Sequence, residues 1–305
     1  MIRVGVVGLG AMGRNHVRIY SNIPGIDLVG VSDVNEEITR AVAHTYHTDG
    51  FVDYVELLRK GLDAVSIAVP TSLHGEIGVR SAESGASILV EKPIADTIAR
   101  ANQLIETCQR SGVKLMVGHV ERFNPVTPVI KKAIEDCEVL SIGIARVGPF
   151  PPRIRDVGVI LDLAIHDIDL ARYLTGSEFK KVYSLYSRDG PNSHEDIALL
   201  SFEMENGVLV HLTANWLTPF KVREIDVAAR EKFVKGWLQE QKAWEYRQWE
   251  ENNSYVVKEL PVSYGEPLKM ELEAFIEAVK GRGDVPVSGE EGLKALTVAL
   301  ECLRV

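Results

Sequence analysis

The chain has 305 residues, of which 46% are hydrophobic and 25% charged, and its formal net charge is −9. This length favours two domains, and the composition is typical of a globular protein. The negative charge disfavours a nucleic-acid-binding surface, and no apolar run is long enough to span a membrane. The scattered Cys108, Cys137 and Cys302 indicate core thiols in a reducing compartment. We therefore expect a cytoplasmic protein that binds neither nucleic acid nor membrane.

Residues 1–33 predict a strand, a glycine turn, a helix and a second strand. The strand Ile2–Val7 leads into Gly8-Leu9-Gly10-Ala11-Met12-Gly13, the helix is Ala11–Tyr20, and the second strand, Ile26–Ser32, ends at Asp33. A G-x-G-x-x-G turn between a strand and a helix, followed about 20 residues later by an acid, is the dinucleotide-binding fingerprint.

Each position of this turn has a physical role in holding a pyrophosphate. Gly8 permits the tight turn, Gly10 lets the backbone approach the phosphates, and Gly13 lets the helix pack closely. Free N–H groups at the helix start, near Ala11 and Met12, face the phosphate charge.

The acid that closes the fingerprint selects the cofactor. The carboxylate of Asp33 would accept hydrogen bonds from the adenosine ribose and would repel a 2′-phosphate, which favours NAD. Arg40, on the next helix, leaves NADP as the weaker alternative.

Strands and helices alternate through the first 120 or so residues, which predicts a doubly wound parallel sheet. The expected helices are 36–44, 53–59, 74–84 and 98–110, and the further strands are 64–69, 87–90 and 114–118. Ligands of such sheets bind beyond the carboxyl ends of the strands. Pro70-Thr71, Glu91-Lys92 and His119–Arg122 should therefore line the same crevice as the glycine turn.

After Pro125 the pattern changes to strands separated by turn signals, which predicts hairpins and an antiparallel sheet faced by helices. The expected helices are 126–137, 162–174, 268–280 and 292–303, and the strands are 139–147, 181–188, 197–203, 208–215, 222–229 and 255–260. The predicted fold is α/β: an N-terminal Rossmann domain, residues 1–122, and a C-terminal α/β domain, residues 123–305, with an open, mostly antiparallel sheet.

The segment 232–251 is ambiguous, since it fits either a helix or strands at the sheet edge. It holds Trp237, Trp244 and Trp249 among many charges. Aromatic residues are enriched at interfaces, so a subunit contact is one interpretation, and an amphipathic surface is the other.

One constellation in the second half suits acid–base chemistry. Asp162 and His166 are four residues apart on the predicted helix and share a face, and Asp169 follows one turn later. Histidine titrates near neutrality and a neighbouring carboxylate would orient it, so the pair suits a reversible base. A solvated helix start with Asp162 as N-cap is an alternative. A metal site of these three residues is another, disfavoured because no further His or Cys lies at ligand spacing.

Lys92 ends a buried strand beside Pro93, where it could donate to a substrate oxygen and to the cofactor ribose. A surface lysine with a buried stem is the alternative. His74 and His119 suit a contact with the cofactor better than catalysis.

Together these motifs resemble the glucose–fructose oxidoreductase / inositol dehydrogenase / rhizopine-catabolism family over essentially the whole chain. The resemblance rests on the glycine turn with Asp33, Glu91-Lys92-Pro93, Arg122-Phe123-Asn124-Pro125, and the block from Gly158 to Asp169; the tail 271–275 with Pro286 and Gly292 also fits.

The resemblance implies metal-independent hydride transfer between a sugar-like hydroxyl and NAD. Carried over, Lys92 would position substrate and nicotinamide, His166 would be the general base, and Asp162 would be its partner and a substrate ligand. Pro70, Thr71 and His74 match positions that contact the cofactor. The resemblance also implies a homodimer or homotetramer formed through the C-terminal sheet.

The substrate is suggested by the proline-rich loop 148–155. Its Arg153 and Arg155 could bind a phosphate or diphosphate bidentately, with Arg122 as a further substrate contact. This loop and residues 118–125 look like the branch acting on nucleotide sugars, the UDP-N-acetylglucosamine 3-dehydrogenases. The alternatives are structural arginines with an uncharged substrate such as myo-inositol or glucose, and a dinucleotide-binding sensor without turnover.

Overall fold

The computed structural model describes residues 1–150, 157–188, 194–249 and 254–304. The chain forms two compact units. The first unit contains Met1–His119 and Leu268–Leu296, and the second contains Val120–Pro267 and Thr297–Val305. This division differs from the predicted 1–122 and 123–305 mainly at the C-terminal end.

The chain returns to the first unit because residues 287–292 pack against its last strand. Val117 N–H donates to the carbonyl of Val287 at 3.0 Å, and Met116 forms an antiparallel bridge with Ser288. A side chain at Gly292 would lie 2.6 Å from Val117, so this approach requires a glycine. Such long-range pairing leaves no local signal in the sequence, which is why the predicted boundary misses it.

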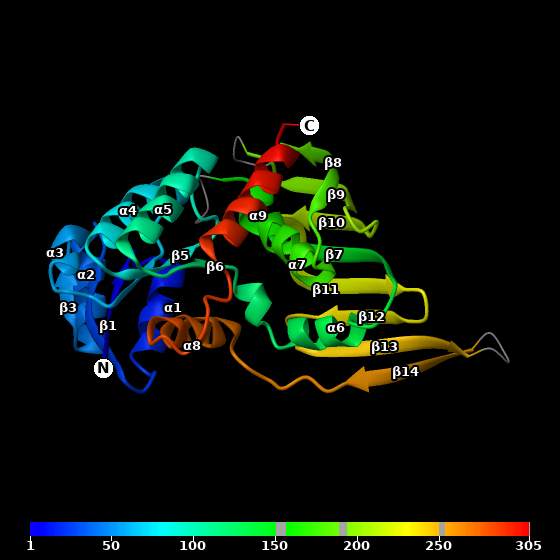
Figure 1. Cartoon of the computed structure of the whole chain (residues 1–305), viewed down its shortest axis with the longest axis horizontal. Helices are drawn as coiled ribbons and strands as arrows, with labels where there is room; N and C mark the ends of the chain where they lie inside the picture. The colour runs from blue at the N-terminus through cyan, green and yellow to red at the C-terminus, as the bar shows by residue number, and fades with distance from the viewer. Residues whose placement is uncertain (151–156, 189–193, 250–253, 305) are drawn as a thin grey trace. The chain divides into compact units, whose positions relative to one another are not determined.

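The sheet of the first unit is parallel, with the strand order β3-β2-β1-β4-β5-β6 (Figure 1). The strands are β1 (Ile2–Val7), β2 (Ile26–Ser32), β3 (Asp49–Phe51), β4 (Ala64–Ile67), β5 (Ser87–Glu91) and β6 (Leu115–Gly118). The buried runs Val4–Val7 and Ala64–Ile67 pair in register, which confirms the doubly wound prediction. Only β3 was not predicted; it is three residues long and exists through its pairing with Gly30–Ser32.

Helices flank this sheet, and their ends carry local signals. They are α1 (Ala11–Tyr20), α2 (Glu36–Tyr46), α3 (Tyr54–Leu58), α4 (His74–Glu83), α5 (Ile98–Ser111), α8 (Pro267–Val279) and α9 (Gly289–Cys302), the last of which continues into the second unit. The hydroxyl of Thr97 accepts from Arg100 N–H at the start of α5. Gly112 ends that helix with φ +66°, a conformation that glycine adopts without strain.

The second unit contains an open sheet of strand order β14-β13-β12-β11-β7-β10-β9-β8 (Figure 1). The strands are β7 (Val139–Pro149), β8 (Phe179–Ser187), β9 (Ile197–Met204), β10 (Leu209–Asn215), β11 (Leu217–Ala229), β12 (Phe233–Trp237), β13 (Lys242–Trp249) and β14 (Ser254–Leu260). All pairs are antiparallel except β7 with β10. This confirms the mostly antiparallel prediction, and the described part of the ambiguous segment, residues 232–249, forms the strands β12 and β13.

Helices α6 (Val126–Ile134) and α7 (Ile165–Thr175) cover one face of this sheet. Ile142 and Ile144 of β7, and Ile225 and Val227 of β11, lie on that face and are buried. Their period of two is the alternation that predicts a sheet with one covered side. Among the residues that the structure describes, no helix has the length and apolar character to cross a membrane.

Candidate active site

The glycine turn has the geometry that its three roles require. Gly8 has φ +91°, and a Cβ there would lie 2.4 Å from the carbonyl oxygen of Ala68. A Cβ at Gly13 would lie 1.8 Å from the carbonyl oxygen of Gly8, so α1 can reach the turn only with glycine at this position. The space beside Gly10 is open, with no protein atom within 4 Å of a Cβ built there. The first and third glycines thus serve packing, and the second leaves room for a ligand.

The start of α1 and Asp33 form the rest of this subsite. Among the described residues no side chain caps α1, so the N–H groups of its first turn remain available to an anion. Asp33 Oδ2 accepts from Leu9 N–H at 2.7 Å, and Oδ1 accepts from Asn35 N–H at 2.9 Å. Each carboxylate oxygen can accept a second hydrogen bond, so these contacts fix Asp33 and still allow a ribose hydroxyl. The open backbone, free donors and fixed acid fit a dinucleotide.

Arg40, the residue that would favour a 2′-phosphate, pairs with Glu36 at 2.6 Å on the surface of α2. Its side chain is exposed, so the ion pair is weak and does not itself decide between NAD and NADP.

His74 ties together the segments that follow β4 and β5. It is 1% exposed, with Nδ1 2.8 Å from the carbonyl oxygen of Pro93 and Nε2 2.9 Å from that of Val69. Burial lowers the pKa of His74, which favours a neutral ring that donates to one of these carbonyls at a time. The predicted contacts Pro70 and Thr71 lie in the first of these segments, between the carboxyl end of β4 and the start of α4 at His74.

The side chain of Glu91, at the end of β5, contacts His16 of α1. Its Oε1 lies 3.1 Å from Nε2 of His16, and both side chains are buried. Burial raises the pKa of Glu91, but the hydrogen bond and charge of His16 outweigh it and the net pKa is lowered. Lys92 follows directly, half-buried, and the Lys92–Pro93 peptide bond is cis. A buried hydrogen bond between His16 and Glu91 therefore anchors the strand end that presents Lys92.

In the second unit, Asp162 and His166 lie on a continuous helix that begins with a π-helical turn, Ile160–Ala164, and continues as α7. The predicted helix 162–174 is thus correct in type but starts two residues late. Each of the two side chains is 9% exposed, which argues against the solvated helix start. A π-turn widens the helix locally and is frequent at functional sites. No group of three metal-ligand side chains occurs among the described residues.

Glu195 holds the start of this helix in place. It is 3% exposed, its Oε1 accepts from Ile160 N–H at 3.0 Å, and its backbone carbonyl accepts from Val159 N–H at 2.9 Å. The carboxylate occupies the space that a side chain at Gly158 would need, because a Cβ there would lie 2.1 Å from Glu195 Cδ. Because residue 158 is a glycine, Glu195 can come close enough to accept from the first N–H groups of the helix. These hydrogen bonds fix the turn that carries Asp162.

A buried charge cluster lies under α7. Arg146 of β7 donates from Nε to Asp167 Oδ1 at 2.7 Å, and from Nη1 to Glu121 Oε1 at 2.6 Å. Burial raises the pKa of Asp167 to about 6, although Arg146 opposes the rise. For Glu121 the same arginine outweighs burial and lowers the pKa. The cluster links β7, the 3₁₀ turn Val120–Phe123 and the residue after His166, so it fixes the position of the helix that carries the candidate base.

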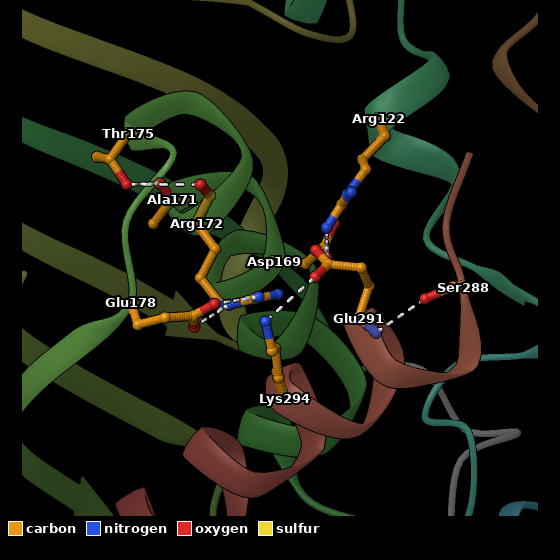
Figure 2. Close-up of polar contacts among 9 residues, drawn as sticks. All are labelled: Arg122, Asp169, Ala171, Arg172, Thr175, Glu178, Ser288, Glu291 and Lys294. Carbon is orange, nitrogen blue, oxygen red and sulfur yellow. Dashed lines mark hydrogen bonds and ion pairs between the residues drawn. The ribbon is translucent and has the colours of Figure 1, made fainter. Parts of the chain in front are cut away.

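Two further arginines of this unit are held by carboxylates (Figure 2). Arg122 binds Asp169 bidentately at 2.7 and 2.6 Å, with its side chain 8% exposed, and Arg172 binds Glu178 bidentately at 2.7 and 2.8 Å. Arg122, predicted as a substrate contact, is therefore engaged within its own unit. Arg153 and Arg155 lie outside the described residues.

The structure thus brings the predicted site residues together in two groups. The glycine turn, Asp33, Pro70, Thr71, His74, Glu91 and Lys92 follow the carboxyl ends of strands in the first unit, and Asp162 and His166 share a helix in the second. Sequence reasoning missed the cluster around Arg146. The sequence does carry a signal for this cluster. On a strand with alternating burial, Arg146 continues the inward-facing series of Ile142 and Ile144 although it is charged.

A parallel sheet in this strand order, with a glycine turn between β1 and α1 and an acid at the end of β2, defines the class of Rossmann-fold dinucleotide-binding proteins. Residues 2–119 match the GFO/IDH/MocA oxidoreductase family, NAD-binding Rossmann fold, and residues 147–233 match the GFO/IDH/MocA C-terminal domain. The chain belongs to this family and is an NAD-binding oxidoreductase.

Characterised relatives resemble the chain along nearly its full length. The UDP-N-acetylglucosamine 3-dehydrogenase of Acidithiobacillus ferrooxidans is 28% identical over 98% of this chain and 96% of its own. A crystal structure of that enzyme superposes with a TM-score of 0.91, covering 98% of this chain and 96% of the other. The scyllo-inositol 2-dehydrogenase (NAD(+)) of Bacillus subtilis is 27% identical over 94% of this chain and 88% of its own. Levoglucosan dehydrogenase in complex with NADH, at 20% identity and a TM-score of 0.89 over 99% and 96% of the chains, shares the fold.

Proposed function

We propose that this protein oxidises a hydroxyl group on the sugar of a nucleotide sugar, with NAD as hydride acceptor. One observation carries the proposal: the 28% identity to the UDP-N-acetylglucosamine 3-dehydrogenase extends over nearly the whole of both chains, with a TM-score of 0.91. The helix with Asp162 and His166 supplies the acid–base groups that this chemistry needs.

In the proposed reaction, the side chains of this chain bind the substrate and move its proton. When bound, NAD supplies the nicotinamide ring that takes the hydride from carbon. His166 accepts the proton of the reacting hydroxyl, and Asp162 orients the imidazole and stabilises its charged form. Lys92 donates a hydrogen bond to the reacting oxygen. The glycine turn, with Asp33 on the ribose, holds the cofactor.

NAD rather than NADP is part of the proposal. An NADP-binding site of this fold needs an arginine near the end of the second strand to meet the 2′-phosphate. Here Asp33 occupies that place, the next residues are Val34 and Asn35, and Arg40 is paired with Glu36.

The test measures NADH absorbance after mixing the protein with NAD and UDP-N-acetylglucosamine, and in parallel with myo-inositol and with glucose. In separate mixtures a keto-acid acceptor is added, and its reduction is measured instead, so that turnover of a retained cofactor is also detected. Activity with the UDP-sugar alone would establish the proposal. Activity with the free polyol or sugar would replace it by a polyol dehydrogenase, which the likeness to the scyllo-inositol enzyme makes the second candidate. Bound NAD without turnover of any substrate would favour a sensor.

We also propose that the uncovered face of the second unit's sheet joins copies of this chain into a homodimer or homotetramer. Tyr183 and Leu185 of β8 are 59% and 73% exposed, and Leu199, opposite Leu185 on β9, is 49% exposed. Trp237 and Trp244 pack edge to face at 4.7 Å on neighbouring strands. Light scattering should show a multiple of the 33.7 kDa chain mass. The variant Leu185→Asp should shift it towards the monomer, and a monomeric wild type would contradict the idea.

A further inference from the structure

Among the described residues of the second unit, four arginines lie wholly or partly buried close to the helix of the candidate base. Three have carboxylate partners: Arg122 binds Asp169, Arg172 binds Glu178, and Arg146 binds both Asp167 and Glu121. The fourth, Arg223 of β11, differs from them. Its Nη1 is buried, and within the described residues this atom has no hydrogen-bond partner.

The sheet register places Arg223 on the helix-covered side. It stands directly opposite Arg146 in the antiparallel pairing of β11 with β7, and directly opposed residues point to the same face. On that face Arg223 continues the buried column Val227, Ile225, just as Arg146 continues the column of Ile142 and Ile144. The two arginines are therefore neighbours on the helix-covered face of the sheet, next to its apolar residues.

The charges around Arg223 leave its guanidinium uncompensated. Burial and the like charge of Arg146 lower its pKa to about 10, although Glu121, Asp167 and Asp162 act in the opposite direction. The first two of these acids already accept hydrogen bonds from Arg146 at 2.6 and 2.7 Å. A partly buried arginine beside another arginine, with a buried Nη1 that has no hydrogen-bond partner among the described residues, costs stability unless a ligand satisfies it.

Asp162, which acts electrostatically on Arg223, belongs to the candidate catalytic pair. Arg223 is half-buried rather than fully enclosed, so part of its side chain remains reachable. Its planar fork of donors matches the oxygens of a carboxylate or phosphate. In a chain of net charge −9, an anionic substrate must be met by such a local group.

We propose that Arg223 is a substrate-binding residue that holds an anionic group of the substrate, a phosphate or a carboxylate, next to the helix of Asp162 and His166. This inference rests on the proposed function, since it names the contact by which a nucleotide sugar is distinguished from a neutral polyol. The anion can belong to the diphosphate or to a carboxylate on the sugar ring, and the two sources are separable by experiment.

The test compares wild type with Arg223→Gln in the NADH-bound protein, using calorimetric titration with UDP, UDP-N-acetylglucosamine and UDP-N-acetylglucosaminuronate. Loss of one charged hydrogen-bonding group should weaken binding about 10- to 100-fold. Weaker binding of all three ligands identifies the diphosphate as the group held. Weaker binding of the uronate alone identifies a ring carboxylate. Arg223→Lys, which keeps the charge and loses the fork, should recover part of the affinity.

Arg230→Gln is the matched control. Arg230 follows β11, is exposed, and pairs with Glu138, so its removal should leave all three affinities unchanged. Thermal unfolding separates binding from structure: because Nη1 of Arg223 has no hydrogen-bond partner among the described residues, Arg223→Gln should keep or raise the melting temperature of the wild type. A lower melting temperature with unchanged affinities would overturn the proposal and make Arg223 structural.

A failure of the proposed function gives a different result. In that case the wild type would bind none of the UDP compounds. Inorganic pyrophosphate, glucuronate and glucose would then be titrated into wild type and Arg223→Gln. Binding of either anion that is lost in the variant would retain the anion-binding role of Arg223, and equal behaviour of the two proteins would overturn it.

Discussion

The glycine turn of the first unit and the charge cluster of the second are built in opposite ways. The turn is formed by the backbone of a short stretch of chain. It requires glycine because Cβ atoms at Gly8 and Gly13 would collide with carbonyl oxygens. The cluster is made of long side chains brought from three separate elements, Glu121, Arg146 and Asp167, each nearly enclosed. The first can be recognised from residue spacing alone, whereas the second depends on sheet register and helix packing.

This difference predicts how each region fails. The glycine turn should be damaged by substitutions that add a side chain, which would weaken ligand binding or disrupt local packing. A buried charge cluster is damaged by removing a partner, which leaves the remaining charges without compensation. The following experiments test these expectations, beginning with the largest effect.

The largest effect is expected for the proposed base. His166→Asn should lower kcat about 10²- to 10⁴-fold, the usual contribution of a general base, and should leave NADH affinity unchanged. Steady-state kinetics and NADH fluorescence titration measure the two quantities. His44→Asn, a change at an exposed position of α2, is the control. Activity that survives in His166→Asn would remove this residue from the proposed mechanism.

Breaking the charge cluster should cost nearly as much, in stability. Arg146→Met leaves Glu121 and Asp167 buried without their partner and should lower the free energy of unfolding by about 3–5 kcal/mol. Urea denaturation measures the loss. The triple variant with Glu121→Gln and Asp167→Asn removes all three charges and should recover part of it. A single variant as stable as wild type would show that water already compensates the cluster.

The cluster should also make stability depend on pH. Because burial raises the pKa of Asp167 to about 6, from about 4 in the unfolded chain, folding favours the protonated form. This contribution is fully present below about pH 4 and is lost as the pH rises to about 6, up to about 3 kcal/mol in total. Asp167→Asn cannot titrate. The melting-temperature difference, wild type minus variant, should therefore fall across this window, and a constant difference would contradict the raised pKa.

Two alanine substitutions in the glycine turn should have different consequences. Gly13→Ala forces Cβ against the carbonyl of Gly8 and should cost about 1–3 kcal/mol of stability, the usual effect of overpacking. Gly10→Ala meets open space in the protein, so it should keep the stability and weaken NADH binding alone. Thermal unfolding with and without NADH resolves the two. If Gly10→Ala binds NADH normally, the pyrophosphate does not pass over this residue.

The smallest effect concerns cofactor choice. Asp33→Asn keeps an oxygen for the N–H of Leu9 or Asn35 but removes the charge, so the preference for NAD over NADP should fall about tenfold, or about 1.4 kcal/mol. The ratio of kcat/KM for the two cofactors measures it. Glu36→Gln, which releases Arg40, is a useful companion because it should leave NAD use unaltered. An unchanged ratio in Asp33→Asn would argue against a ribose contact.

Local signals were sufficient for most of the fold. Strand Ile2–Val7, helix Ala11–Tyr20 and strand Ile26–Ser32 have the predicted bounds, because apolar runs, a glycine turn and caps lie within the segments themselves. The π-turn at Ile160–Ala164 was not predictable in this way. The first N–H groups of this helix donate to Glu195, which is more than 30 residues further along the chain.

By itself, the sequence determined the doubly wound sheet, the dinucleotide fingerprint with Asp33, and the spacing of Asp162 and His166, since each depends on periodicity or on a short run of residues. Tertiary structure alone decided that Leu268–Leu296 joins the first unit, that Arg122 is held by Asp169, and that Arg223 faces Arg146 with no carboxylate bound to it among the described residues. The physical reason is that ion pairing among buried arginines is set by which strands are neighbours and in which register, and neither is encoded in any local stretch of chain.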